Sequence, residues 1–137
     1  MSRNFGIREA KEIRLLEDIA LETSATSPDA YVASAPEYIG GFDKVAFRID
    51  GTAVAANGGG SFFIQIADQP VPDKSHLWTT YGRLIDMDGS ASQAKVEIVG
   101  NEPKVVFFAA NDYASYVRVL GTANTNGSYT VTLMATA

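Results

Sequence analysis

The sequence contains the residue types of a catalytic triad, namely one histidine and many hydroxyl and carboxylate side chains. His76 is the only histidine, and serines and aspartates are plentiful. The chain nevertheless has no G-x-S-x-G motif, the sharp strand-to-helix turn that presents the nucleophile of many hydrolases. We therefore interpret His76 as a surface or strand-start residue and predict no catalytic residues.

A short acidic segment, Asp86-Met87-Asp88-Gly89, is similar to the start of a calcium-binding loop. Counting from Asp86 places Glu97 at the twelfth position, where an EF-hand has its bidentate glutamate. The middle does not match, because Ala91 stands where the loop requires glycine and Ala94 offers no side-chain oxygen. Cysteine is absent, which excludes disulfides and thiolate metal sites. We expect no metal ion and no other cofactor.

Two further patterns belong to phosphate binding and to glycoside hydrolysis. The run Asn57-Gly58-Gly59-Gly60 lacks the lysine and the following helix of a phosphate-binding loop, so we predict a flexible hairpin turn there. The pairs Asp68–Asp73 and Asp86–Asp88 have the carboxylates that glycosidases use, but closeness in sequence does not set the separation that this chemistry needs. The sequence therefore predicts a protein that is not an enzyme.

Aromatic residues could instead form a binding face for sugars. The candidates are Trp78, Tyr81, Tyr113, Tyr116 and Tyr129. In a β-sandwich such rings more often fill the core or pair across strands, which is the interpretation we favour. Single-stranded nucleic acid would need the same rings in a basic groove, whereas the formal net charge is −5. We expect no nucleic-acid partner.

The elements that must position these residues are mostly β-strands. From Phe42 onward, apolar and polar residues alternate in short runs that are separated by turn residues. The expected strands span residues 44–50, 61–67, 76–87, 95–99, 104–110, 115–120 and 128–136. Seven or eight short strands in a chain of 137 residues predict one all-β domain, an antiparallel β-sandwich or jelly roll.

The N-terminal 22 residues differ in composition, because they hold nine of the 27 charged residues. Their pattern predicts a helix from about Ile7 to Leu21, with Ile13, Leu16 and Ala20 in an apolar stripe. A helix this short is marginal alone in water. Its stripe must pack either on its own sandwich or on a neighbouring subunit, and both remain open at this point.

Residues 23–41 contain two prolines, two terminal glycines and many small polar residues, which is typical of an extended arm. Tyr31 and Tyr38 are among its apolar anchors. We therefore divide the chain into an N-terminal helix and arm, residues 1–41, and a β-sandwich domain, residues 42–137. Neither the charged N-terminus nor the polar-interrupted stretch Val119–Ala137 matches a signal peptide or a membrane span, so we expect no membrane partner.

The C-terminal pattern SYVRVLGTANTNGSYTVTLMATA, from Ser115 to Ala137, together with the arm-plus-sandwich layout, resembles head decoration (cement) proteins of tailed bacteriophages. The resemblance implies a structural virion protein that is made in the host cytoplasm and binds the outside of the capsid. It implies two partners, the major capsid protein and further copies of the chain in a homotrimer. The candidate partner-docking residues are Ile13, Leu16, Ala20, Tyr31 and Tyr38. A carbohydrate- or receptor-binding module of a phage tail or fibre is the alternative.

Overall fold

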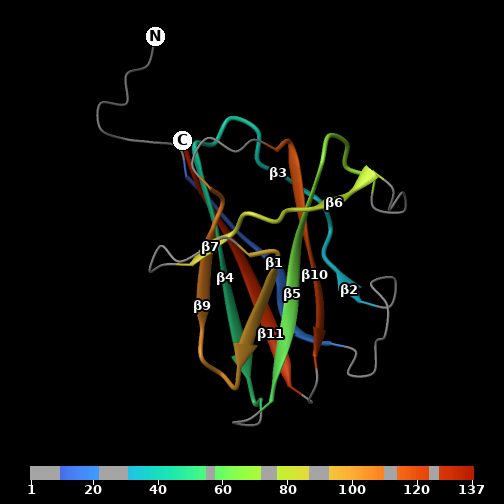
Figure 1. Cartoon of the computed structure of the whole chain (residues 1–137), viewed down its shortest axis with the longest axis vertical. Helices are drawn as coiled ribbons and strands as arrows, with labels where there is room; N and C mark the ends of the chain where they lie inside the picture. The colour runs from blue at the N-terminus through green and yellow to red at the C-terminus, as the bar shows by residue number, and fades with distance from the viewer. Residues whose placement is uncertain are drawn as a thin grey trace.

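The computed structural model describes residues 10–21, 31–54, 58–71, 77–86, 93–109, 114–123 and 127–137, and these form eleven β-strands. Most run along the long axis of the molecule (Figure 1). The strands are β1 (Ala10–Ala20), β2 (Val32–Ala33), β3 (Glu37–Tyr38), β4 (Lys44–Thr52), β5 (Gly59–Ala67), β6 (Thr79–Thr80), β7 (Ile85–Asp86), β8 (Lys95–Val99), β9 (Lys104–Phe107), β10 (Tyr116–Ala123) and β11 (Ser128–Thr136). No helix among these described residues is long and apolar enough to cross a membrane.

The strands form two antiparallel sheets. Sheet A has the order β1-β11-β4-β9-β7, and sheet B has the order β2-β10-β5-β6, with β3 also paired to β10 and β8 to β5. The pairing is nested: β1 pairs with β11, β2 and β3 with β10, β4 with β9, and β5 with β8. The chain thus follows a long hairpin rolled into two facing sheets, which is the jelly roll. The predicted fold class is confirmed.

The predicted N-terminal helix is wrong for residues 10–20, which form β1 at the edge of sheet A; residues 7–9 lie outside the described part of the chain. Three apolar residues of β1 lie opposite buried residues of β11: Ile13 opposite Leu133, Leu16 opposite Val131, and Ile19 opposite Tyr129. Two β-bulges separate them, and each adds one residue to the two-residue period of a strand. Apolar side chains therefore recur every third residue, a spacing that imitates a helix face.

The β1 strand is tied to both sheets. At the second bulge Asp18 has a left-handed φ of 48°, and its amide N–H donates to the Thr130 hydroxyl at 3.0 Å. The Lys11 ammonium donates to the Tyr38 carbonyl in sheet B at 2.8 Å and pairs with Glu37. The described residues on both sides of the predicted boundary at residue 41 thus share the same sheets, and a separate N-terminal domain stays a prediction.

The core lies between the inner faces of the two sheets. Phe62 of β5 and Tyr129 of β11 meet edge to face across it, with ring centroids 5.4 Å apart. The alternating pattern of the expected strands predicts six core residues, Val45, Phe47, Ile64, Phe107, Val117 and Val131, and the five other than Phe107 are buried. Phe107, predicted with them, is half-buried instead. It pairs with Ala46 on the outer side of sheet A, whereas its neighbour Val106 occupies the core, because side chains alternate along a strand.

The structure also differs from the prediction of a turn at the glycine run, residues 57–60. Gly59 and Gly60 begin β5, rather than forming a flexible turn; Asn57 lies outside the described residues. A β-carbon on Gly59 would come within 1.9 Å of the Ile98 carbonyl oxygen in β8. The glycine is needed because the two backbones approach too closely for any side chain.

Candidate functional site

The residues predicted to dock on a partner occupy different environments. On β1, Leu16 is 6% exposed within its own core, Ile13 is half-buried, and Ala20 is exposed. Tyr31 is half-buried and stacks on Phe63 of β5 at 6.0 Å. The five residues thus do not form one surface stripe, and their role in docking remains a prediction.

Tyr38 is the most exposed aromatic side chain among the described residues, at 51%. It is the register partner of Tyr116, and the two rings meet edge to face with centroids 5.3 Å apart. Tyr116 in turn pairs with Ala67 of β5. Because Val117 points into the core, the row Tyr38–Tyr116–Ala67 lies on the outer face of sheet B.

A groove lies near the end of β5. It has a volume of about 250 Å³ and is lined by Ile66, Ala67, Asp68, Leu77, Thr79 and Ala114. Ile66 is the register partner of both Val117 and Thr79 and packs against the core. Because Val117 points into the core, this groove opens on the inner side of sheet B and not on the face that carries Tyr38 and Tyr116.

Beside the Tyr38–Tyr116 pair, the outer face of sheet B is closed by its own side chains. Arg118 points outward yet is only 6% exposed, because the Trp78 ring lies 4.6 Å from its guanidinium carbon. Its Nε donates to the Gln65 side-chain oxygen at 2.9 Å, and the Trp78 indole donates to the Val71 carbonyl at 3.0 Å. Burial lowers the pKa of Arg118, although a guanidinium remains protonated in proteins. These contacts hold Arg118, Gln65 and Trp78 together over this part of the face.

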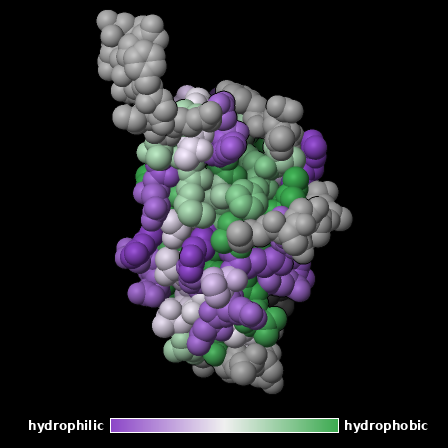
Figure 2. All heavy atoms as spheres, turned by 90° about the vertical axis from the view of Figure 1, so that its left-hand side faces the viewer, coloured by the Kyte–Doolittle hydropathy of each residue, from purple (hydrophilic) through white to green (hydrophobic). Residues whose placement is uncertain are grey.

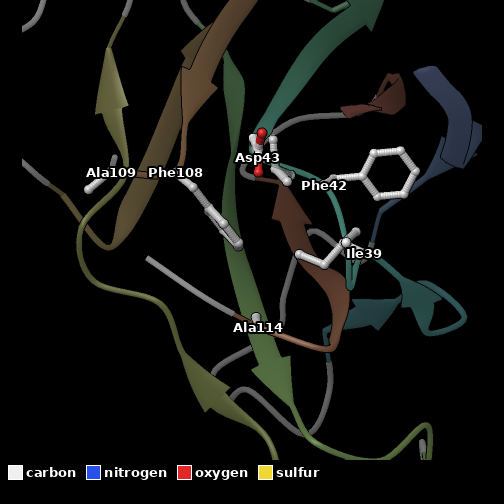
Figure 3. Close-up of a pocket in the computed structure, with 8 residues that line it drawn as sticks. Ile39, Phe42, Asp43, Phe108, Ala109 and Ala114 are labelled. Carbon is white, nitrogen blue, oxygen red and sulfur yellow. The ribbon is translucent and has the colours of Figure 1, made fainter. Parts of the chain in front are cut away.

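A smaller pocket lies at one end of the sandwich (Figure 3). Phe108 reaches toward its centre from one side and Ile39 lies on the other, with Asp43 and Ala114 nearby (Figure 3). Its volume of about 30 Å³ has room for a water molecule. This is too small for an organic substrate.

The outer face of sheet A carries a different surface. Register places Ile85, Phe107, Ala46 and Met134 in one row across β7, β9, β4 and β11. Apolar and hydrophilic side chains alternate over the side of the molecule that carries β7 and β9 (Figure 2). Arg48 and Asp50 form an ion pair on this face at 3.1 Å. The row is a second candidate contact surface.

The described residues contain no group of three or more His, Cys, Asp or Glu side chains placed to hold a metal ion. Asp86, the first residue of the calcium-like segment, accepts from the Gln93 amide at 2.6 Å and lies 3.7 Å from the Lys104 ammonium. His76, Asp73 and Asp88 lie outside the described residues. The predictions that rest on them are not addressed by the structure.

Most of the aromatic residues proposed for sugar binding lie inside the protein. Trp78, Tyr81 and Tyr129 are buried, as the interpretation of core packing predicted, and Tyr113 lies outside the described residues. Tyr116 is half-buried and packs beside the exposed Tyr38. The sequence did not group these two residues, because no local pattern shows that β3 and β10 become neighbours.

Comparisons with known proteins point to the fold. No family model matches the chain, and no curated protein matches it by sequence. The crystal structure of the SPBc2 prophage-derived protein YomS is similar, with a TM-score of 0.63 and 11% identity over 96% of each chain. The chain shares this protein's fold. Since identity is so low, the similarity extends to architecture and not to individual site residues.

Proposed function

We propose that this chain is a structural protein of a tailed-phage particle, and that it binds the outside of the capsid and bridges neighbouring capsid subunits. The observation that carries the proposal is the match to a prophage-derived protein along 96% of both chains. Jelly rolls are also a recurrent architecture of viral capsid domains. The resemblance of residues 115–137 to cement proteins supports the same role.

The proposed mechanism is association and not catalysis. Bridging proteins act by burying surface between subunits, and stable protein interfaces bury roughly 1,200–2,000 Å². The described surface offers two regions for such contacts, the apolar row of sheet A and the Tyr38–Tyr116 pair of sheet B. We propose the major capsid protein as the partner, and a homotrimer as the assembled form, made in the host cytoplasm before it joins the particle.

Co-sedimentation with capsids is the direct test. The purified chain is mixed with intact and with decoration-stripped capsids of the phage whose genome encodes it, and the pellets are analysed by mass spectrometry. We expect saturable binding at a fixed ratio to capsid protein and added resistance of the capsids to heat. If the chain stays in the supernatant and is absent from purified particles, the structural role is wrong.

Oligomeric state and partner class need separate measurements. Multi-angle light scattering at micromolar concentration should give three times the monomer mass, and a monomer would contradict the trimer. The formal net charge of −5 opposes binding to nucleic acid phosphates. We therefore expect no shift of DNA in a gel and no flotation with lipid vesicles. Binding in either assay would contradict the proposed set of partners.

A further inference from the structure

We propose that the outer face of sheet A packs face to face against the same face of a second copy, about a two-fold axis that crosses the strands between Ala46 and Arg48. The contact joins copies in pairs. It goes beyond the structural role proposed above and does not depend on it. It is supported by the order in which β1, β11, β4 and β9 place charged, large and small side chains on this face.

Two rows of side chains cross the middle of this face. On β11, β4 and β9 they consist of Met134, Ala46 and Phe107 in the first row and of Thr132, Arg48 and Val105 in the second. A two-fold axis between the rows places each row over the other. The exposed Arg48 then lies over the buried Ala46 of the second copy, and the half-buried Met134 lies over its buried Thr132. Phe107 lies over Val105. Large side chains thus face small ones, and apolar side chains face each other.

The charges of the face are self-complementary about the same axis. On β1, Glu12 continues the first row and Arg14 continues the second. On β4, Lys44 and Asp50 lie one step outside the two rows, on opposite sides. The axis therefore brings Glu12 over Arg14 of the second copy, and Lys44 over its Asp50. Each of these four side chains faces the opposite charge.

Other two-fold arrangements of this face oppose like charges, which is unfavourable at short range. An axis along β4 would place Lys44 and Arg48 each over the same residue of the second copy. An axis along the first row would place Lys44 over Arg48. Facing sheets pack about 10 Å apart with their strands at roughly 30°, and the long side chains of Glu12 and Arg14 can span the offset that this angle produces at β1.

The balance of charge on this face also differs from that of the whole chain. The formal net charge of −5 opposes the association of copies in general. Among the described residues of this face, Arg14, Lys44 and Arg48 balance Glu12 and Asp50, and Arg14 also pairs with Glu17 at 2.6 Å. An acidic chain can therefore meet itself here without net repulsion.

The size of the face predicts a weak contact. The β4 and β11 strands have nine residues each, whereas β9 and β7 are short. At roughly 3.4 Å per residue and 4.8 Å between strands, the face covers roughly 500 Å² per copy. Two copies would bury on the order of 1,000 Å², which is below the roughly 1,200–2,000 Å² of stable interfaces. The contact is therefore absent at micromolar concentration and forms at higher concentration.

Small-angle X-ray scattering of the full chain, from micromolar to millimolar concentration, tests this contact. We expect the scattering mass to double as the concentration rises, whatever its value at the lowest concentration. Lys44→Asp and Asp50→Lys each place like charges opposite one another, and each should weaken this association about tenfold. Thermal melts of both variants check that they fold, since Lys44 is exposed and Asp50 is half-buried.

Mixing the two variants gives the decisive comparison. In a mixed pair, the two acidic positions of one copy face the two basic positions of the other, so opposite charges meet again at both places. The mixture should therefore associate like the parent chain, although neither variant does so alone. Glu97→Lys reverses an exposed charge on the outer face of sheet B, and as the matched control it should leave the association unchanged.

Three results would overturn the inference. One is a constant mass up to millimolar concentration. Another is parent-like association of either variant alone, or no recovery in the mixture. The third is an equal loss in Glu97→Lys and Lys44→Asp, which would place the contact on another face. If either variant fails to fold, Glu12→Arg and Arg14→Glu reverse the charges on β1 and give the same comparison, alone and mixed.

Discussion

The two sheets differ in how far the side chains on their outer faces are exposed to solvent. On sheet B, the outward residues Arg118 and Leu120 are each 6% exposed. Trp78 lies over Arg118, and the half-buried pair Tyr31–Phe63 borders Leu120. On sheet A, outward residues such as Arg48 are exposed, and Met134 and Phe107 are half-buried. The centre of sheet B is thus covered by its own side chains. The outer face of sheet A is covered less evenly, because Ala46 and Thr132 are buried there while Arg48 is exposed.

The difference concerns the surface that each sheet presents to a partner. On sheet B the exposed outward residues lie away from its centre, at Tyr38 and along β8. On sheet A a row of apolar side chains crosses four strands and can offer a broad contact to another protein subunit. A broad contact therefore suits sheet A better than the centre of sheet B.

Removal of β1 should have the largest effect, because sheet A depends on this strand for a complete edge. Deleting residues 1–21 removes Leu16 and Leu21 from the core and exposes the edge of β11. We expect loss of cooperative folding, or a decrease of several kcal/mol in the free energy of unfolding. Urea and thermal melts of the truncated and full-length chains measure it.

Point variants separate packing from attachment in the same strand. Leu16→Ala should cost about 2–4 kcal/mol, while the exposed Ala20→Ser should stay within about 0.5 kcal/mol. An unchanged melt of the truncated chain, together with weaker capsid binding, would show that the N-terminal segment serves attachment alone. That would restore the separate arm predicted from sequence.

The two sides of sheet A can be compared through two phenylalanines. Phe47 is fully buried on the inner side, so Phe47→Ala should cost about 3–5 kcal/mol. Phe107 is half-buried on the outer side, and Phe107→Ala should cost only about 1–2 kcal/mol. Denaturant melts give both values. Equal losses would mean that the outer face of sheet A is covered in solution, and light scattering would then show whether a second copy covers it.

The outer faces themselves can be compared through Leu120 of sheet B and Met134 of sheet A. Leu120→Ala should cost about 2–4 kcal/mol because the side chain is enclosed. Met134→Ala should cost about 1 kcal/mol, since part of that side chain is already in water. Chemical denaturation of both variants is the measurement. A Met134 variant as unstable as the Leu120 variant would contradict the contrast between the faces.

The smallest effect is expected at the open corner of sheet B, where Lys95 and Glu97 pair at 2.9 Å on β8. Their hydrogen bond raises the pKa of Lys95 and lowers the pKa of Glu97. The stabilisation from Glu97 is therefore present above its unfolded-state pKa and is lost as pH falls through the lowered folded-state pKa. Because both side chains are exposed, Glu97→Gln should leave the Tm near pH 7 almost unchanged.

Measuring the same variant at progressively lower pH completes this test. Below the lowered folded-state pKa of Glu97 the parent and Glu97→Gln proteins should melt together, because the Glu97 carboxyl of the parent is then protonated and neutral, like the glutamine amide. A large difference in Tm near pH 7 would mean that this part of sheet B is buried against another surface in solution.

The period-two alternation from Phe42 onward was enough to predict six of the seven expected strands, the β-sandwich class and five of six core residues. The seventh expected strand, residues 76–87, instead contains the short strands β6 and β7, which belong to different sheets. The correctly predicted features depend on neighbours within a few residues, because a strand with one buried face must alternate. The facing of Phe107 was wrong because two adjacent phenylalanines, Phe107 and Phe108, give no local sign of which one points inward. Phe108 is the ring that packs with Phe47 and Tyr81, at 5.7 and 4.3 Å.

The N-terminal strand and the groove at the end of β5 were decided by tertiary structure. In β1 the sequence shows apolar residues at helical spacing, and only pairing with β11, from the opposite end of the chain, introduces the two bulges that make this spacing fit a strand. The groove joins residues 66–68 with Leu77, Thr79 and Ala114, which are distant in sequence. Local periodicity fixes which side of a strand is apolar, but contacts between distant segments determine which partner covers it and where it remains open.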